Sequence, residues 1–309
     1  MVTGESSTPA APRLRRSLLW VPGDDERKLA KGPTAGADSL VLDLEDAVVP
    51  AHKVKAREIV RDSLLHLDFR GAEKLVRINP LETGLALDDL TVTMAGGPDG
   101  YMIPKVRSED DVRFLDRALS NLEAISGRPQ GSVRLILLAT ETPEGVLNIR
   151  RIAQASLRSA GMMWASEDLS SALGSRRSRR ADGSLPDVFA FARSACLLAA
   201  AAAGMDPLDM PYFEFHDDAG LEREALEAAE LGFTGKGAIH PAQVAIINRV
   251  FIPSEEEVAE ANALLAAATE AFARGQAAFV YKGAMVDAPH INRARKIVAR
   301  ANAARESGT

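Results

Sequence analysis

The sequence has little of several residue types, and each shortage excludes a class of protein. Cys196 is the one cysteine among 309 residues, so neither an intrachain disulfide nor a cluster of thiolate metal ligands can form. No run of about 18 consecutive apolar residues is present, which argues against a transmembrane helix, and the first residues lack the apolar core of a signal peptide. We therefore expect a cytoplasmic protein.

Positive charge and aromatic side chains are also scarce. The chain carries 37 Lys and Arg against 43 Asp and Glu, a formal net charge of −6, and only 5% of its residues are aromatic. Proteins that coat nucleic acid need surplus positive charge to release counterions from phosphates, so we expect no nucleic-acid partner. Because a long apolar run is also missing, we expect no membrane partner. Hydrophobic residues make up 46% of the chain, which is typical of a globular protein with a substantial core.

Short β-rich runs alternate with longer helical patterns along the chain. This order is typical of parallel strands joined by crossover helices. Among the helices predicted between strands, the one over 108–125 begins with Ser108 and Asp111 at the spacing of a capping box. The other helices are predicted near 51–67, 187–203 and 220–231, and eight strands are predicted near 17–21, 39–44, 74–78, 100–103, 133–138, 159–164, 210–213 and 237–239.

Two α/β architectures suit this order, a TIM (β/α)8 barrel and a doubly wound open sheet. The first strand is followed by Pro22-Gly23-Asp24 instead of G-x-G-x-x-G, so the dinucleotide fingerprint of the open sheet is missing. We therefore predict a TIM barrel, in which functional residues follow the carboxyl ends of the strands. The expected organisation is a disordered tail over 1–14, a barrel over 15–250, and a C-terminal helical extension over 251–309 that reaches a neighbouring subunit's site or the barrel mouth.

Charged side chains follow five consecutive predicted strands, so we expect them to converge on one face of the barrel. Carboxylates without matching His or Cys indicate a hard cation such as Mg²⁺, and an arginine beside them can clamp a substrate carboxylate. Each residue also has a structural interpretation as a helix cap, an ion-pair partner or a surface charge. The residues are Asp43, Glu45 and Asp46 after the second strand, Arg77 and Asn79 after the third, Lys105 after the fourth, Glu141 after the fifth, and Glu167 and Asp168 after the sixth.

Seven motifs occur along the chain in order, and together they carry a family resemblance. They are Leu18-Leu19-Trp20-Val21-Pro22-Gly23, Leu42-Asp43-Leu44-Glu45-Asp46-Ala47-Val48, Val76-Arg77-Ile78-Asn79, Pro104-Lys105-Val106, Glu141-Thr142-Pro143-Glu144-Gly145, Ser166-Glu167-Asp168-Leu169 and Gly235-Lys236-Gly237-Ala238-Ile239-His240-Pro241. From about Arg15 to Arg300 the chain resembles the citrate lyase β-subunit-like branch of the HpcH/HpaI aldolase family, which includes malyl-CoA and citramalyl-CoA lyases. The resemblance implies a TIM barrel, a homotrimer or dimer of trimers, and Mg²⁺, with Mn²⁺ as a substitute.

The resemblance also implies roles for individual residues. Glu141 and Asp168 match the metal-binding carboxylates, and Arg77 matches the arginine that binds the oxo-acid portion and stabilises enolate charge. Asp287 resembles an aspartate that reaches a neighbouring subunit's site as acid or base, although by sequence alone it is an N-cap for the last helix. Further candidates are Glu45 and Asp46 as catalytic residues, and Arg16, Lys28, Lys105 and Glu167, together with Arg77, as contacts to substrate or CoA.

These observations predict a Mg²⁺-dependent carbon–carbon lyase of the oxo-acid type. It would cleave a 3-hydroxyacyl-CoA such as malyl-CoA or citramalyl-CoA to acetyl-CoA, or a homologue, and a 2-oxo acid. The same enzyme could form the 3-hydroxyacyl-CoA in the reverse direction. The alternatives are a citrate lyase β subunit acting on a citryl thioester, a thioesterase on the same barrel, and a non-catalytic metabolite-binding protein. The oxo acid is left open, because one methyl group changes affinity by only about 1–3 kcal/mol.

Overall fold

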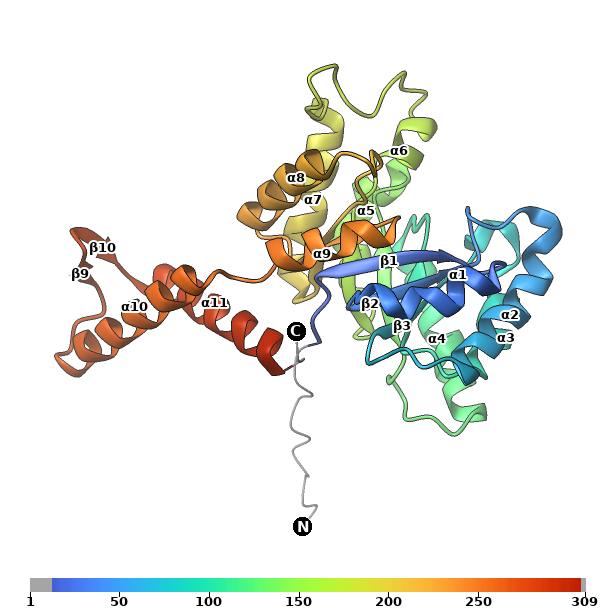
Figure 1. Cartoon of the computed structure of the whole chain (residues 1–309), viewed down its shortest axis with the longest axis horizontal. Coiled ribbons are helices and arrows are strands. Elements are labelled where there is room, and N and C mark those ends of the chain that lie inside the picture. The colour runs from blue at the N-terminus through green and yellow to red at the C-terminus, as the bar shows by residue number, and fades with distance from the viewer. Residues whose placement is uncertain (1–12, 307–309) are drawn as a thin grey trace, which may run out of the picture. The chain divides into compact units, whose positions relative to one another are not determined.

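The computed structural model describes residues 13–306, which fall into two compact units (Figure 1). The larger unit is Arg15–Phe251, which we call the barrel unit, and the smaller one contains the chain from Ile252 onward, which we call the C-terminal unit. The tail predicted over 1–14 lies, except for its last two residues, outside the described residues.

Eight strands of the barrel unit form one closed parallel barrel, which confirms the predicted TIM architecture. Each strand pairs with the next in sequence, and the last pairs with the first through Leu18 opposite Gly237. The strands are β1 (Ser17–Pro22), β2 (Ser39–Asp43), β3 (Glu73–Arg77), β4 (Gly100–Ile103), β5 (Arg134–Leu138), β6 (Ser159–Met163), β7 (Asp206–Asp209) and β8 (Gly235–Ala238).

Helices follow the strands and end or begin at local signals in the sequence. The capping box predicted for α4 is present, because the Ser108 side chain accepts from the Asp111 amide while Asp111 accepts from the Ser108 amide. The helices of the barrel unit are α1 (Glu26–Lys31), α2 (Lys53–His66), α3 (Ala86–Met94), α4 (Glu109–Ile125), α5 (Pro143–Ala153), α6 (Glu167–Ala172), α7 (Asp187–Ala203), α8 (Asp218–Leu231) and α9 (Pro241–Val250).

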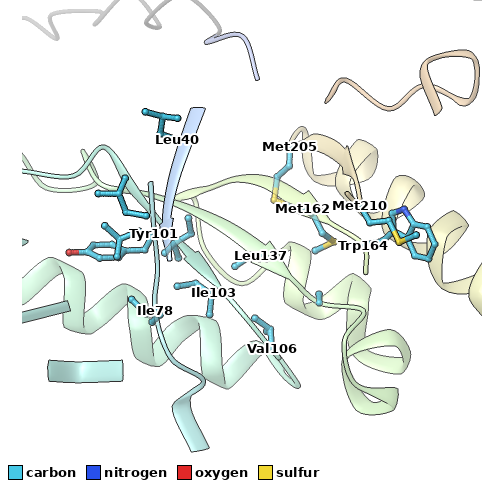
Figure 2. Close-up of a cluster of buried hydrophobic side chains, with 14 of the residues drawn as sticks. Leu40, Ile78, Tyr101, Ile103, Val106, Leu137, Met162, Trp164, Met205 and Met210 are labelled. Atoms are coloured by element: carbon cyan, nitrogen blue, oxygen red, sulfur yellow. The ribbon is translucent and has the colours of Figure 1, made fainter. Parts of the chain in front are cut away.

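The barrel wall separates two hydrophobic layers, because successive side chains of a strand point to opposite faces. One layer fills the interior and takes Leu18, Val41, Leu75, Met102, Ile136, Leu138, Met163 and Leu208 from seven strands. The other lies between the strands and the helices, and Figure 2 shows part of it, including Tyr101, Ile103, Leu137, Met162 and Trp164. Above the interior layer, toward the carboxyl ends of the strands, the side chains become charged.

The seventh strand is not where the sequence predicted it. We expected it near 210–213, but β7 is Asp206–Asp209, and the segment after it is loop. The sequence Asp-Pro-Leu-Asp is typical of a turn. In the barrel, however, backbone pairing with the neighbouring strands β6 and β8 holds these four residues in a strand. The Pro207 carbonyl accepts from the Thr234 amide at 2.8 Å, so the missing proline N–H does not interrupt that side of the strand.

The C-terminal unit contains two long helices and a hairpin. They are α10 (Glu255–Ala273), β9 (Phe279–Tyr281), β10 (Ala284–Val286) and α11 (Ala288–Glu306), with β9 and β10 antiparallel. Lys282 and Gly283 make the hairpin turn with φ of 48° and 82°, the backbone that a two-residue turn of this kind requires. Across residues 13–306, every helix is too short or too polar to be a candidate membrane span.

Candidate active site

Asp43 and Arg77 are the first charged pair above the barrel's interior core. They end β2 and β3, where they are register partners, and each lies two residues beyond an interior side chain, Val41 or Leu75. The Arg77 Nε and Nη2 donate to the two Asp43 carboxylate oxygens at 2.8 and 2.6 Å. Amides of the following loop also donate to Asp43, so the carboxylate is fully engaged and fixes the guanidinium plane.

Glu45 links this pair to Lys105. Its Oε2 lies 2.8 Å from Arg77 Nη1, and its Oε1 accepts from Lys105 Nζ at 2.5 Å. Glu45 is buried, whereas Asp46 is exposed and lies 3.6 Å from Arg77 Nη1 and 3.9 Å from Lys105 Nζ. The loop after β2 therefore supplies one buried carboxylate and one exposed carboxylate, each within ion-pair distance of the same two cations.

Glu141 enters the cluster from the loop between β5 and α5. The Thr142 hydroxyl caps α5 by accepting from the Gly145 amide, and a Cβ on Gly145 would lie 2.4 Å from the carbonyls of both Ala139 and Val106. Glycine thus allows α5 to begin close against the barrel. This tight turn leaves Glu141 buried, with its Oε2 accepting from the Lys105 amide at 2.6 Å.

Asp168 joins the cluster from the first turn of α6, while its neighbour Glu167 does not. Asp168 is partly buried, and its Oδ1 lies 3.3 Å from Lys105 Nζ. Glu167 is exposed and accepts a hydrogen bond from the Ser166 hydroxyl. The structure therefore brings Glu45, Asp46, Arg77, Lys105, Glu141 and Asp168 together, and leaves Glu167 at the edge.

Burial and neighbouring charge shift the pKa values in this cluster. Burial, together with the negative charges of Glu45 and Asp168, raises the pKa of Glu141 to about 8, against the opposing effects of Arg77 and of the hydrogen bond from the Lys105 amide. Burial also raises the pKa of Glu45. For Lys105, burial alone would lower the pKa, but its hydrogen bond and charge interaction with Glu45 outweigh this and raise it, so the ammonium stays charged.

The donor set fits Mg²⁺. Within residues 13–306, no three His, Cys, Asp or Glu side chains form a group able to hold a metal ion by themselves. Mg²⁺ however usually takes one or two carboxylates and completes its octahedron with water and substrate. Glu141 and Asp168 provide two carboxylates, and the negative charge crowded around Glu141 is what a divalent cation would neutralise.

Arg16 and Lys28, two of the residues predicted to contact CoA, lie outside the cluster. Arg16 directly precedes β1, so it lies at the amino end of the barrel strands, whereas the cluster lies at their carboxyl ends. Its side chain is buried, and its Nε and Nη2 donate to the Asp38 carboxylate at 2.8 and 2.7 Å. This position does not support the predicted contact to CoA. Lys28 follows β1 on α1, is exposed, and lies 3.4 Å from Asp25.

Asp287 belongs to the C-terminal unit, at the junction of β10 and α11. Its Oδ1 lies 2.7 Å from His290 Nδ1, and its carbonyl accepts from the Ile291 amide at 3.2 Å. The side chain is half exposed. Its catalytic role stays a prediction.

Asp43 is the member of the cluster to which the sequence assigned no role. Its position at a strand end was recognised, but its function as the partner of Arg77 depends on the register between β2 and β3. The sequence contains a signal for this pairing. Both residues end a buried strand, and in each strand side chains alternate between the two faces, so that both Asp43 and Arg77 fall on the interior face.

In a closed parallel barrel, active sites lie at the carboxyl ends of the strands. Here that end carries buried carboxylates, which suit a divalent cation, and a fixed guanidinium, which suits a substrate carboxylate. Residues 16–241 match the family described as HpcH/HpaI aldolase/citrate lyase, and the chain belongs to that family. This confirms the resemblance drawn from the motifs, and it makes the chain an oxo-acid lyase of the citrate lyase β type.

Relatives with different substrates align over nearly the whole chain. Citrate lyase subunit beta of Haemophilus influenzae is 36% identical over 94% of this chain and 97% of its own length. The mitochondrial citramalyl-CoA lyase of Homo sapiens is 33% identical, covering 94% and 87%. The L-malyl-CoA/beta-methylmalyl-CoA lyase of Rhodobacter capsulatus is 35% identical, covering 96% and 98%.

A solved structure shares both the fold and the extent of this chain. CitE from Mycobacterium tuberculosis, in complex with magnesium, acetoacetate and coenzyme A, aligns with a TM-score of 0.76 at 35% identity, over 93% of this chain and 97% of that one.

Proposed function

We propose that this chain is a Mg²⁺-dependent lyase that cleaves or forms the carbon–carbon bond of a 3-hydroxyacyl-CoA of the malyl-CoA or citramalyl-CoA type. The products of cleavage are acetyl-CoA, or a near homologue, and a small 2-oxo acid. The observation that carries the proposal is the convergence of a fixed guanidinium, Arg77, with the two carboxylates Glu141 and Asp168 at one end of the barrel. Relatives that act on CoA thioesters and a structure that binds magnesium and CoA support it.

In this reaction Glu141 and Asp168 hold the metal. A Mg²⁺ ion held there would supply the positive charge that lowers the pKa of the substrate hydroxyl. In cleavage the hydroxyl proton passes to solvent, the carbon that bore the hydroxyl becomes the carbonyl of the 2-oxo acid, and the electron pair of the broken bond stays on the thioester as an enolate.

Arg77 provides fixed positive charge for the enolate. Its Nε and Nη2 are held by Asp43, so the guanidinium is already oriented before substrate binds and costs no reorganisation during the reaction. Glu45 holds the Nη1 side of the same guanidinium, and Asp46 extends the cluster to its exposed edge. We therefore propose that Glu45 is a positioning residue, which orients Arg77 and Lys105.

Asp287 completes the proton balance. In cleavage it protonates the enolate carbon to give the methyl group of acetyl-CoA, and in condensation it removes that proton. We propose that it does so in the site of a neighbouring subunit of a homotrimer or dimer of trimers. Lys28, exposed on the carboxyl side of β1, is the remaining candidate for a CoA phosphate contact. Lys105 and Glu167 are proposed as further contacts to the substrate.

The test is incubation of the purified protein with a panel of 3-hydroxyacyl-CoA thioesters, in Mg²⁺ and in EDTA, with mass spectrometry of the products. Metal-dependent formation of an acyl-CoA together with a 2-oxo acid is the expected result. Free CoA with an intact hydroxy acid would show a thioesterase instead. Absence of turnover across the panel would contradict the CoA-lyase proposal.

A citryl thioester on an acyl carrier protein is the second candidate substrate. It is favoured by the 36% identity to a citrate lyase β subunit over almost the full length of both chains. Turnover of a carrier-bound citryl thioester, without turnover of the CoA panel, would establish this alternative.

A further inference from the structure

Lys105 contacts both of the proposed metal ligands, each through a different group. Its backbone N–H donates to Glu141 Oε2 at 2.6 Å, and its Nζ lies 3.3 Å from Asp168 Oδ1. Within the part of the chain that the structure describes, Asp168 forms no other ion pair with a lysine or arginine. The ammonium therefore supplies the positive charge at this carboxylate.

The backbone of Lys105 is held in an unusual conformation to make these contacts. Its φ is 50°, in the left-handed region that side chains other than glycine rarely adopt. It comes two residues after the end of β4, where Pro104 precedes it. Strain of this kind persists where surrounding contacts over-determine the residue, and such residues gather at functional sites.

Arg77, the other cation of the cluster, pairs with carboxylates other than Asp168. Arg77 pairs with Asp43 through Nε and Nη2 and with Glu45 through Nη1, and within residues 13–306 it forms no ion pair with Asp168. The Lys105 ammonium does not depend on Asp168 for a partner, because its Nζ lies nearer to Glu45, at 2.5 Å from Oε1, and is also 3.9 Å from Asp46 Oδ1. A small movement of this flexible side chain therefore suffices to lose the 3.3 Å contact to Asp168 while the hydrogen bond to Glu45 stays.

We propose that the Lys105 ammonium is a displaceable counter-ion of the metal site: it neutralises Asp168 while no divalent cation is bound, and it gives up that contact, keeping its hydrogen bond to Glu45, when one binds. This inference rests on the proposed function, because that function assigns Glu141 and Asp168 to Mg²⁺. A lysine that only stabilised the loop would stay on Asp168 in both states. A displaceable lysine instead competes with the metal and so sets its affinity.

The decisive measurement is the Kd of Mg²⁺ by isothermal titration calorimetry for the wild type and Lys105→Met. Methionine keeps an unbranched side chain on the same left-handed backbone but removes the charge. We expect Mg²⁺ to bind about tenfold more tightly, because a like charge next to the divalent cation is gone. We also expect the metal-free variant to melt at a lower temperature than the wild type. Lys105→Arg, which keeps the charge, should lie closer to the wild type in Kd.

Lys282→Met is the matched control. Lys282 also has a left-handed backbone, with φ of 48°, and is paired with Glu260, but it belongs to the C-terminal unit. Its replacement should leave the Kd of Mg²⁺ unchanged. A Kd of Mg²⁺ that is unchanged or higher in Lys105→Met would overturn the inference. A wild type that binds no Mg²⁺ would instead overturn the proposed metal site itself.

A second measurement does not depend on the variant folding. Crystal structures of the wild type are determined in EDTA and with Mn²⁺, whose anomalous signal locates the metal. The expected result is that Nζ is near Asp168 in EDTA and away from it with metal bound. Nζ on Asp168 in both structures would contradict the displacement.

Discussion

Asp43 and Arg77 are paired twice, once as register partners of β2 and β3 and once through a two-point ion pair with distances of 2.8 and 2.6 Å. The backbone pairing places the two side chains on the interior face at the same height, and the ion pair then fixes the guanidinium plane. Burial by itself would lower the pKa of Arg77, but the charge of Asp43 and its hydrogen bonds outweigh this and raise it, so the guanidinium is permanently charged.

Asp43→Asn should damage both stability and turnover. The amide nitrogen of asparagine can only donate, so at either oxygen position it would face both a guanidinium N–H and a loop amide N–H that now donate to Asp43. Breaking one side of a buried ion pair costs about 3–5 kcal/mol, which urea denaturation would measure. We expect kcat to fall by about tenfold or more, because Arg77 loses its fixed orientation.

Asp88→Asn is the control for this change. Asp88 is exposed and lies 3.5 Å from Arg57, so the same substitution at an arginine-paired aspartate should change the free energy of unfolding by about 0.5 kcal/mol or less. Equal effects of the two substitutions would contradict the special role of the Asp43–Arg77 pair.

Glu141→Gln should abolish Mg²⁺-dependent turnover and leave the fold intact. The amide has the same shape but lacks the ligand charge, so calorimetry should show loss of tight Mg²⁺ binding while circular dichroism stays unchanged. Glu144→Gln, three residues further on in the exposed first turn of α5, should keep both binding and activity. Turnover near the wild-type rate in Glu141→Gln would remove Glu141 from the metal site.

The metal-free protein should lose stability as the pH rises. Burial and the charges of Glu45 and Asp168 raise the pKa of Glu141 from 4.5 to about 8 in the folded chain, so between these values the folded state holds a proton that the unfolded state has released. The stabilisation is complete below pH 4.5 and is lost as the pH rises through 8. Denaturation in EDTA across this range should show the decline.

Glu141→Gln provides the check, because it cannot titrate and should flatten the pH profile. Mg²⁺ requires the ionised carboxylate, so its affinity for the wild type should increase toward pH 8 and its binding should release a proton. Calorimetry in buffers of different ionisation enthalpy detects that proton. A pH-independent affinity between 5 and 8 would contradict the raised pKa.

A shared site predicts complementation between two inactive variants. If Asp287 acts in a neighbouring subunit's site, mixing Asp287→Ala and Glu141→Gln subunits creates some sites with both an intact aspartate and an intact metal ligand. We expect partial recovery of activity in the mixture and none in either variant alone. Failure to recover activity, with subunit exchange verified by native mass spectrometry, would argue that each chain uses its own Asp287.

Much of the fold could be predicted from local patterns. The capping box at Ser108, the buried run of β5 and the order of strands and helices are properties of short segments, and they are present in the structure as expected. The strand containing Pro207 was misplaced, because its four residues look like a turn and only pairing with β6 and β8 makes them a strand. Arg16 was assigned to CoA although it precedes its strand, and strand direction alone places it at the opposite end.

The sequence by itself determined that strand-end carboxylates, an arginine and a lysine would gather at one face, because parallel strands bring their carboxyl ends to the same side. The tertiary structure alone decided which of these groups touch. Register sets Asp43 opposite Arg77, and the left-handed backbone of Lys105 directs its amide to Glu141 while its ammonium reaches Glu45 and Asp168. These contacts join residues from five different strand ends, so their geometry depends on closure of the barrel and on no segment alone.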